Sequence, residues 1–410
     1  MKRVVFLVVM GLMTLNACAQ NAFVGIQGPN LIKPNGDKLF IKGTNLGNWL
    51  NPEGYMFGFS KTNSGWMIDL LLKEMVGPEE TANFWAEFKE NYITAEDIRF
   101  IAQQGANTIR MPFHYKLFTT EDFMGNPSPL QNGECEGFKY MDRVIGWCRD
   151  NGLYLILDMH DCPGGQTGDN IDDSYGYPWL IESEGLQQQF CQIWQMIAQR
   201  YKDEPVILGY ELMNEAIPHY MSNKAELKPL LEKLYRRGVE AIRKVDNNHI
   251  ILIGGAEWNS NFDCITDWSY DDKIMFTCHR YGGDALKEAI GGFTEFRDRT
   301  NRPMYMGEIG HNTMEWQTKF SQVMQECNIG YTFWPYKKVD DSCMNGVVRP
   351  ENWDSLVVKF SETDRTTYKQ MQDERPDMKQ VRMVLRQYLE NIKFANCVPQ
   401  KSYIESMKLK

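Results

Sequence analysis

The sequence predicts an α/β protein that folds as a single (β/α)₈ barrel of the TIM type. Eight short apolar runs alternate with longer amphipathic stretches along the 410 residues, a rhythm typical of βα units. Several runs are almost continuously apolar, as expected for parallel strands that helices cover on their outer side. No long linker divides the chain, and barrels of this kind fill this length as one domain.

The first residues precede the fold. An apolar run, Val4–Leu15, follows two basic residues and is too short for a permanent transmembrane helix. Leu15–Cys18 resembles a bacterial lipobox, and an A-x-A-like site for ordinary cleavage overlaps it. We expect residues 1–20 to be a signal peptide and residues 21–410 to be the single folded domain. The protein would then be exported to the periplasm or cell envelope, or secreted, and would touch a membrane only through a lipid on Cys18.

The eight strand candidates are β-branched or apolar runs between turn signals. In chain order they are Leu39–Gly43, Asn107–Met111, Tyr154–Met159, Val206–Met213, Ile250–Gly254, Ile274–Cys278, Pro303–Gly307 and Gly330–Trp334. A hairpin is predicted at the N-terminus, from Gly25 to Lys42, with Asn35-Gly36 as its turn. We expect this hairpin to close the bottom of the barrel.

Helical patterns lie between the strands. They include Ala95–Gln104, Met141–Asp150, Leu186–Arg200, Ala225–Val245 and Thr313–Cys327. Beyond the last strand, Asp373–Ile392 is predicted as one further helix, and the end after Val398 as a loose tail.

Composition restricts the classes of function. The net charge is −10, and the chain has no cluster of basic residues, so a phosphate backbone would be repelled and a nucleic-acid partner is not expected. The negative charge does not exclude a neutral sugar as the ligand. The ten cysteines include no C-x-x-C pair, and we expect most of them to be small buried core residues, with one or two disulfides left open.

Polar side chains gather at one end of the predicted strands. Catalytic groups of such barrels lie at the carboxyl ends of the strands, where the variable βα loops begin. Residues that finish a strand or follow it directly are Arg110, Asp158, His160, Asn214, Glu215, His279, Arg280, Tyr281, Glu308 and Trp334. At the opposite end only His249 is comparable, and we interpret it as structural.

Two of these residues, Glu215 and Glu308, have the properties of a catalytic pair. Glu215 follows an apolar strand, and Glu308 comes directly after Gly307. A glutamate at the end of a buried strand is costly to place, so a function is expected. Two carboxyl groups about 5–5.5 Å apart could cleave a glycosidic bond by double displacement. Their mutual repulsion would keep one protonated as the acid while the other ionises as the nucleophile.

Seven short motifs in order resemble glycoside hydrolase family 5 of clan A, from about Leu39 to Pro335. They are Gly43–Trp49, Ile109–Pro112, Leu157–His160, Asn214-Glu215, His279–Tyr281, Gly307–Gly310 and Trp334. The resemblance implies that Glu215 is the acid/base and Glu308 the nucleophile of a retaining β-glycosidase. It also implies that Arg110 and Tyr281 orient Glu308, His279 contacts Glu215, Asn214 holds the sugar 2-hydroxyl, His160 lines the −1 subsite and Trp334 forms its stacking floor.

One departure from the family concerns the residue after the Asn-Glu pair, which is usually proline and here is Ala216. Because proline at this place shapes the backbone, the change bears on loop geometry and not on catalysis. Residues 85–118 and 160–170 are similar to the exo-acting β-1,3-glucanases of the family. Residues 56–64 and 171–179 differ from them, so the linkage and the choice of exo or endo action stay open. We expect a β-glucan-type substrate and a monomer.

Alternative functions need different features. A metal site built on His160, His279, His311 and Asp158 would lack the usual H-x-H or H-E-x-x-H spacing, and no metal or cofactor is expected. A non-catalytic sugar-binding barrel could lose the two glutamates and their supporting residues, which this chain keeps. Within the enzyme class, a β-mannanase or a glycolipid β-glycosidase of the same fold is the leading alternative.

Overall fold

The computed structural model describes residues 22–120, 129–131 and 134–410. The predicted signal peptide, with Cys18, lies outside the described residues. Within the described ranges, no helix has both the length and the apolar character that crossing a bilayer requires.

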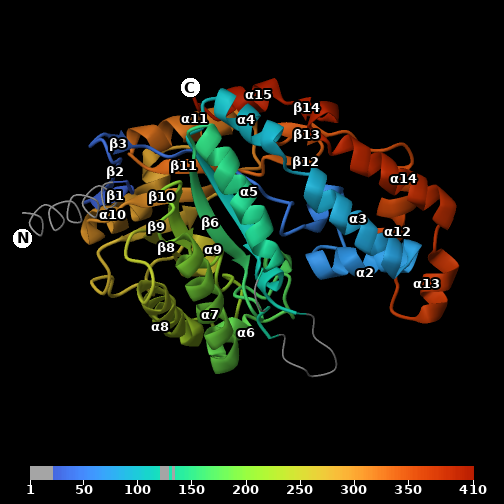
Figure 1. The fold of residues 1–410 in the computed structure, drawn as a ribbon, viewed down its shortest axis with the longest axis horizontal. Helices are drawn as coiled ribbons and strands as arrows, with labels where there is room; N and C mark the ends of the chain where they lie inside the picture. The colour runs from blue at the N-terminus through green and yellow to red at the C-terminus, as the bar shows by residue number, and fades with distance from the viewer. Residues whose placement is uncertain (1–21, 121–128, 132–133) are drawn as a thin grey trace, which may run out of the picture.

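The centre of the molecule is a closed barrel of eight parallel strands, which confirms the predicted fold class (Figure 1). The strands follow one another around the barrel in chain order, and β11 pairs with β4 to close it. They are β4 (Lys42–Asn45), β5 (Thr108–His114), β6 (Tyr154–Asp161), β7 (Ile207–Glu211), β8 (Ile250–Gly254), β9 (Ile274–His279), β10 (Met304–Gly310) and β11 (Gly330–Trp334). Each overlaps a predicted run, and the bounds of β8 and β11 are as predicted.

Amphipathic helices connect the strands and cover the outer face of the barrel (Figure 1). They are α4 (Ala95–Gln103), α5 (Glu136–Asp150), α7 (Glu184–Tyr201), α8 (Lys224–Arg243), α10 (Gly291–Thr300) and α11 (Met314–Glu326). Five of them match the predicted helices; α10 was not predicted. Short elements in the segments that follow the barrel strands are η1 (Gly54–Phe57), η2 (Tyr115–Phe118), η3 (Asn170–Asp172), α6 (Trp179–Glu182), α9 (Ala256–Asn259) and η4 (Lys287–Ile290).

The N-terminal hairpin is present and carries one extra strand. Strands β1 (Gly25–Gln27), β2 (Asn30–Ile32) and β3 (Lys38–Leu39) form an antiparallel sheet. Leu39 pairs with Leu31 in this sheet, which is why the first barrel strand begins at Lys42 rather than at Leu39. Leu31 and Leu39 share a buried cluster with Ile156 and Leu208, residues near the amino-terminal ends of β6 and β7. The hairpin therefore closes the bottom of the barrel.

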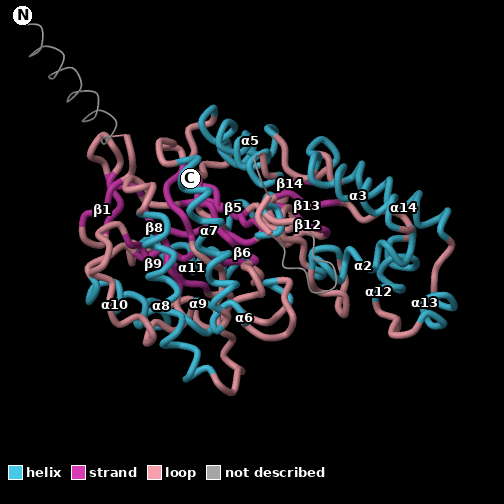
Figure 2. Tube along the Cα trace, turned by 60° about the horizontal axis from the view of Figure 1, so that its bottom comes forward, coloured by secondary structure: helices cyan, strands magenta, loops and turns pink. Residues whose placement is uncertain are grey.

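A helical lobe stands beside the barrel and is the largest feature that was not predicted (Figures 1 and 2). It contains α2 (Gly65–Val76), α3 (Pro78–Asn91), η5 (Trp353–Val358), α12 (Lys359–Ser361), α13 (Tyr368–Glu374) and α14 (Met378–Asn391). Stacked aromatic rings join its parts: the ring centroids of Trp353 and Tyr388 lie 4.7 Å apart, and those of Phe84 and Tyr388 lie 6.1 Å apart. The helix expected over 373–392 is present as α14 but begins only at Met378, because Pro376 forces Arg375 out of the helical conformation (ψ 123°).

The C-terminal end is ordered, which corrects the expectation of a loose tail. Strand β14 (Val398–Pro399) joins β12 (Lys337–Val339) and β13 (Asn345–Val347), and η6 (Phe394–Asn396) and α15 (Lys401–Ser406) flank it. Tyr403 and Met407 are buried, and the Ser406 carbonyl accepts a hydrogen bond from Ser321 of α11. The tail thus packs on the barrel through apolar side chains. The segment is too short for its sequence pattern to predict this packing.

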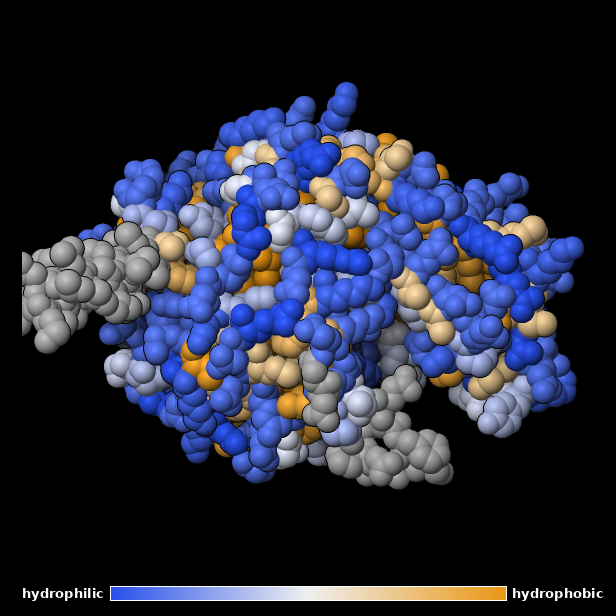
Figure 3. Space-filling model, in the orientation of Figure 1, coloured by the Kyte–Doolittle hydropathy of each residue, from blue (hydrophilic) through white to orange (hydrophobic). Residues whose placement is uncertain are grey.

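The apolar residues of the chain lie mainly inside. The surface shown in Figure 3 is largely hydrophilic, with small and separate hydrophobic areas. The nine cysteines in the described ranges are free, and most are buried, which confirms their interpretation as core residues and leaves no disulfide among them.

Candidate active site

A cavity of about 360 Å³ opens at the carboxyl end of the barrel. Six of the eight predicted site residues line it: His160, Asn214, Glu215, Tyr281, Glu308 and Trp334. The other two, Arg110 and His279, lie beneath its floor and contact the lining glutamates. The structure therefore brings all eight predicted residues together.

The negative charge of Glu308 is better compensated by its neighbours than that of Glu215 would be. Arg110 Nη1 donates to its Oε1 at 2.7 Å, and the Tyr281 hydroxyl donates to its Oε2. The preceding residue must be glycine here: a Cβ on Gly307 would lie 2.6 Å from Thr277 Oγ1 and 2.9 Å from His279 Nε2. The cation and the phenol hold this carboxylate charged and in one orientation.

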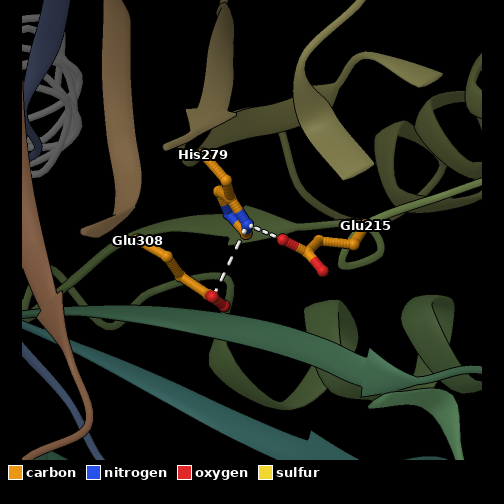
Figure 4. A group of neighbouring side chains, drawn as sticks. All are labelled: Glu215, His279 and Glu308. Carbon is orange, nitrogen blue, oxygen red and sulfur yellow. Dashed lines mark hydrogen bonds and ion pairs between the residues drawn. The ribbon is translucent and has the colours of Figure 1, made fainter. Parts of the chain in front are cut away.

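Glu215 lies in a different environment, in the loop after β7. Its Oε1 accepts a hydrogen bond from His279 Nδ1 at 2.7 Å (Figure 4), and its backbone carbonyl accepts one from the Thr167 hydroxyl. Burial raises the pKa of Glu215 to about 8, although the positive charge of Arg110 acts in the opposite direction. At neutral pH this carboxyl group is therefore protonated.

His279 sits between the two glutamates (Figure 4). Burial lowers its pKa to about 4, so the imidazole is neutral at neutral pH. With the Nδ1 proton directed at Glu215, the Nε2 atom is free to accept, and the Asn259 amide nitrogen lies 3.4 Å from it. His279 Nδ1 is also 3.6 Å from Glu308 Oε2. The ring thus links the two carboxyl groups without adding a charge.

The ligating atoms of Glu215, His279 and Glu308 all lie within 4.8 Å of one another. This triangle is the one group among the described residues with donors placed for a metal ion. The donors are already engaged, because His279 Nδ1 carries the proton that bonds Glu215 and Glu308 is paired with Arg110. A divalent ion would have to displace that proton and would lie beside a guanidinium.

Arg110 organises the floor of the site, and its side chain is fully buried. It binds Glu211 of β7 in a bidentate manner, from Nε to Oε2 and from Nη2 to Oε1, both at 2.8 Å. Its Nη2 is also 3.0 Å from Asp158 Oδ2, and other hydrogen bonds reach Asn214 and Asn45. Arg110 is thus both the counter-ion of buried carboxylates and the partner of Glu308.

Glu211 was not predicted. The signal was present, since this glutamate interrupts the apolar run Val206–Met213. Burial raises the pKa of Glu211, while the charge of Arg110 lowers it. The bidentate contact fixes the guanidinium plane, which in turn fixes the direction from which Glu308 is held.

His160 and Trp334 form one wall of the cavity. Their rings are parallel within 5°, with centroids 5.0 Å apart. Burial lowers the pKa of His160 to about 3, so its neutral ring bonds Asp158 Oδ2 through Nδ1 at 2.7 Å and accepts from the Asn214 amide at 3.1 Å. Trp334 Nε1 donates to the Tyr55 hydroxyl at 2.7 Å.

The cavity also has lining residues that were not predicted to contact a sugar: Glu53, Tyr55, Asn170, Ile171 and His311, of which His311 appeared only in the metal-site alternative. Glu53 is a third buried carboxyl group, and the Asn170 amide lies 3.3 Å from its Oε2. Burial, and then the charges of Glu308 and Glu215, raise the pKa of Glu53 well above its usual value. It follows the Gly43–Trp49 motif closely, in a loop whose path the sequence did not define.

Comparison with known proteins gives a consistent result. The family model "Cellulase (glycosyl hydrolase family 5)" matches residues 73–340. A β-xylosidase of Phanerodontia chrysosporium is 33% identical over 247 residues, which are 60% of this chain and 49% of that protein. Endoglucanase C of Acetivibrio thermocellus is 25% identical over 329 residues, covering 65% of this chain and 90% of that protein. A probable glucan 1,3-β-glucosidase A of Emericella nidulans is 30% identical over 249 residues, 59% of this chain and 57% of that protein. The chain thus spans about half the length of the β-xylosidase and the glucosidase.

Solved structures show the same fold at lower identity. A rutinosidase from Aspergillus niger has a TM-score of 0.58 and 18% identity, with 74% of this chain and 91% of that chain covered. An endogalactoceramidase has a TM-score of 0.57 and 16% identity, with coverage of 77% and 75%. Endoglucanase Cel5A from Thermotoga maritima has a TM-score of 0.51 and 19% identity, with coverage of 74% and 91%.

Proposed function

Because the chain belongs to the cellulase family, glycosyl hydrolase family 5, we propose that it hydrolyses β-linked glycans of the β-glucan type with retention of configuration. The observation that carries the proposal is the unequal pair of carboxyl groups. Glu215 is held neutral by burial, and Glu308 is held as a carboxylate by Arg110 and Tyr281. One oxygen of each lies within 4.8 Å of the other, a separation that suits direct attack and leaves no room for an intervening water of an inverting enzyme.

The proposed reaction has two steps. In the first, a Glu308 oxygen attacks the anomeric carbon while Glu215 donates its proton to the glycosidic oxygen, so that the leaving sugar departs as an alcohol. In the second, the Glu215 carboxylate removes a proton from water, the water oxygen bonds the anomeric carbon, and the ester to Glu308 breaks. Glu215 ends the cycle protonated and Glu308 ends it ionised, as in the resting site.

The supporting residues have matching roles in this proposal. Arg110 and Tyr281 compensate the charge of Glu308 before attack and after release. The Asn214 amide, fixed at both ends by Arg110 and His160, is placed to bond the sugar 2-hydroxyl. Trp334, stacked on His160, offers an apolar face to the sugar ring.

The substrate is tested with a panel of laminarin, lichenan, pustulan, cellulose, mannan and xylan, together with aryl β-glucoside and β-xyloside. The endoglucanase and glucan 1,3-β-glucosidase relatives favour a glucan, and the β-xylosidase relative favours a xyloside as second candidate. We expect the native protein to release sugar from one of these and the Glu308→Gln variant, with unchanged circular dichroism, to release none. No product from any substrate would overturn the proposal and favour a non-catalytic sugar-binding barrel.

Chemical rescue separates the two glutamates. Glu215→Ala should lose activity on polymers, and azide should restore turnover of aryl glycosides whose leaving group needs no proton, giving the β-glycosyl azide. Glu308→Ala with azide should give the α-glycosyl azide instead. The same anomer from both variants would contradict the assigned roles.

We also propose that the N-terminal segment directs export and that cleavage before Cys18 makes this residue the lipidated N-terminus, on the grounds of the lipobox-like sequence Leu15–Cys18. Labelling with radioactive palmitate in a bacterial host should mark the native chain and not a Cys18→Ser variant. If neither chain is labelled and the mature N-terminus is a residue other than Cys18, ordinary signal cleavage is favoured.

A further inference from the structure

A second concave surface, of about 520 Å³, lies outside the catalytic pocket. We call it the aromatic cleft and define it by Tyr115, Tyr175, Trp179, Gln188, Gln189 and Gln192, which all line it. Tyr115 is in η2, directly after β5; Tyr175 is in the loop after β6; Trp179 begins α6; and the glutamines lie in the first half of α7. The aromatic cleft is therefore on the same face of the barrel as the catalytic pocket, because this face is built by the segments that follow the strands.

Two of its three aromatic rings are exposed to solvent, whereas Tyr115 is buried. Tyr175 is 68% exposed and Trp179 is 47% exposed. Trp179 leans on Tyr177, with ring centroids 4.7 Å apart and an angle of 54° between the planes, so one ring supports the other. Large exposed rings that pack so little against the core are available to a ligand, and covering them would bury a substantial apolar area.

The polar side chains that the structure describes in the aromatic cleft are neutral. Gln188 and Gln192 are exposed and one helical turn apart, so they point from the same side of α7. The described residues that line the cleft include no Asp, Glu, Lys or Arg, although 24% of the chain is charged. Amides both donate and accept hydrogen bonds. Flat rings beside neutral amides match a pyranose, which has apolar C–H faces and hydroxyl edges, and do not match an acidic or phosphorylated ligand.

One loop joins the aromatic cleft to the catalytic pocket. Ile171 lines the pocket and Tyr175 lines the cleft, and the three residues between them limit their Cα–Cα distance to about 14 Å. The loop is fixed between these points. Asp172 Oδ2 accepts hydrogen bonds from the backbone N–H groups of Thr167 and Gly168 at 2.6 and 2.7 Å, and Asp173 Oδ2 lies 3.0 Å from the His114 Nε2 atom.

We propose that the aromatic cleft is a second binding site for the neutral β-linked glycan, which holds a stretch of the polymer while another part of the same chain occupies the catalytic pocket. This inference rests on the proposed function and adds to it that the substrate is a polymer rather than a short glycoside. The fixed loop keeps the two sites at a constant distance. The cleft then raises the affinity for a long chain through effective concentration and leaves the chemistry at Glu215 and Glu308 unchanged.

Binding is measured first, by electrophoresis in native gels that contain laminarin or lichenan, with Glu308→Gln as the parent so that the polymer is not degraded. The test variant adds Tyr175→Ala and Trp179→Ala. The matched control adds Tyr368→Ala, an aromatic residue of α13 that is 82% exposed and remote from the cleft. We expect the polymer to retard the parent and the control to the same extent. The affinity of the test variant for the polymer should be about tenfold lower, as the loss of two stacking contacts implies.

Kinetics on the otherwise native enzyme then separate the cleft from the catalytic pocket. The two alanine substitutions should leave kcat/KM for an aryl β-glycoside within about twofold and raise KM for the polymer about tenfold, and Gln192→Leu should act in the same direction more weakly. Retardation of the test variant equal to that of the parent would overturn the proposal, as would an equal loss on the aryl glycoside and the polymer. Absence of aryl-glycoside and polymer hydrolysis by the native enzyme would count against the proposed function, and the gel assay would still report on the cleft.

Discussion

The unequal environments of Glu215 and Glu308 predict that the same isosteric change, glutamate to glutamine, has opposite effects on stability at the two positions. Glu215 is neutral in the folded site because burial raises its pKa from the usual 4.5 to about 8. Glu308 is charged and pairs with Arg110 at 2.7 Å. Glutamine imitates the neutral form of a carboxyl group, so it preserves the first arrangement and breaks the second.

The magnitude for Glu215 follows from linkage. A folded-state pKa above the unfolded one gives stability that is complete below pH 4.5 and is lost as the pH rises through about 8. Each unit corresponds to about 1.4 kcal/mol, so the loss has an upper limit of about 5 kcal/mol. Glu215→Gln does not titrate and escapes this loss. Its advantage over the native protein should be near zero at pH 4.5, grow through the interval to pH 8 and then level off.

Glu308→Gln removes a charge-assisted hydrogen bond to a buried guanidinium, which costs about 1.5–3 kcal/mol. Thermal unfolding followed by circular dichroism at several pH values measures both effects. For a chain of this length the unfolding entropy is about 0.8 kcal/mol per kelvin, so the expected changes at pH 8 are a rise of up to about 6 °C for Glu215→Gln and a fall of about 2–4 °C for Glu308→Gln. A rise for Glu308→Gln together with a fall for Glu215→Gln would refute the assignment of the neutral and charged partners.

Three further predictions concern the site. The alkaline limb of the pH profile of kcat/KM should fall near pH 8, where Glu215 loses its proton. Asn259→Asp should favour the imidazolium form of His279, and this positive charge should lower the pKa of Glu215 and move the limb about one to three pH units lower. An unmoved limb in a folded variant would contradict a link through His279. Arg110→Met leaves buried carboxylates without their cation, so unfolding should become easier by about 3–5 kcal/mol, and an unchanged melting temperature would show that the guanidinium is not needed there. Dialysis against EDTA should leave hydrolysis unchanged, whereas a loss that zinc restores would make Glu308 and its neighbours a metal site.

The parts of the site that the sequence predicted are those that a strand end determines. In a parallel barrel, a residue in the carboxyl-terminal part of a strand or directly after it lies at or just below the catalytic rim whatever the loops do. Arg110, Glu215, His279 and Glu308 could therefore be placed from the predicted runs, although β5 and β10 continue beyond Arg110 and Glu308. Glu211 could not be placed in the same way, because its role depends on pointing into the barrel two residues before the predicted end of its strand. The inward direction follows from the register between β6 and β7, which shifts between Leu155 and Ile156.

The helical lobe and the C-terminal tail escaped prediction for another reason. Their apolar residues are completed by partners distant in the chain, as where Phe57 packs on Phe88 and Tyr388. Neither α2 nor α14 shows from its own sequence that the other exists. A local pattern can predict a buried face, but not the segment that covers it.

The backbone beside the proposed acid/base carboxyl group carries strain that no motif of the family indicates. Ile217 and the three consecutive residues 257–259 all have φ between 50° and 59°, a region that costs a residue other than glycine about 1–3 kcal/mol. The two strained segments support each other, since the Glu257 N–H donates to the Ile217 carbonyl at 2.7 Å. The turn places the Asn259 side chain against Gly254, where an added Cβ would lie 2.0 Å from Asn259 Oδ1. It also directs Asn259 Nδ2 at His279. Strain of this size persists only where the surrounding contacts fix the conformation, and here they fix the imidazole that keeps the neutral carboxyl group in place.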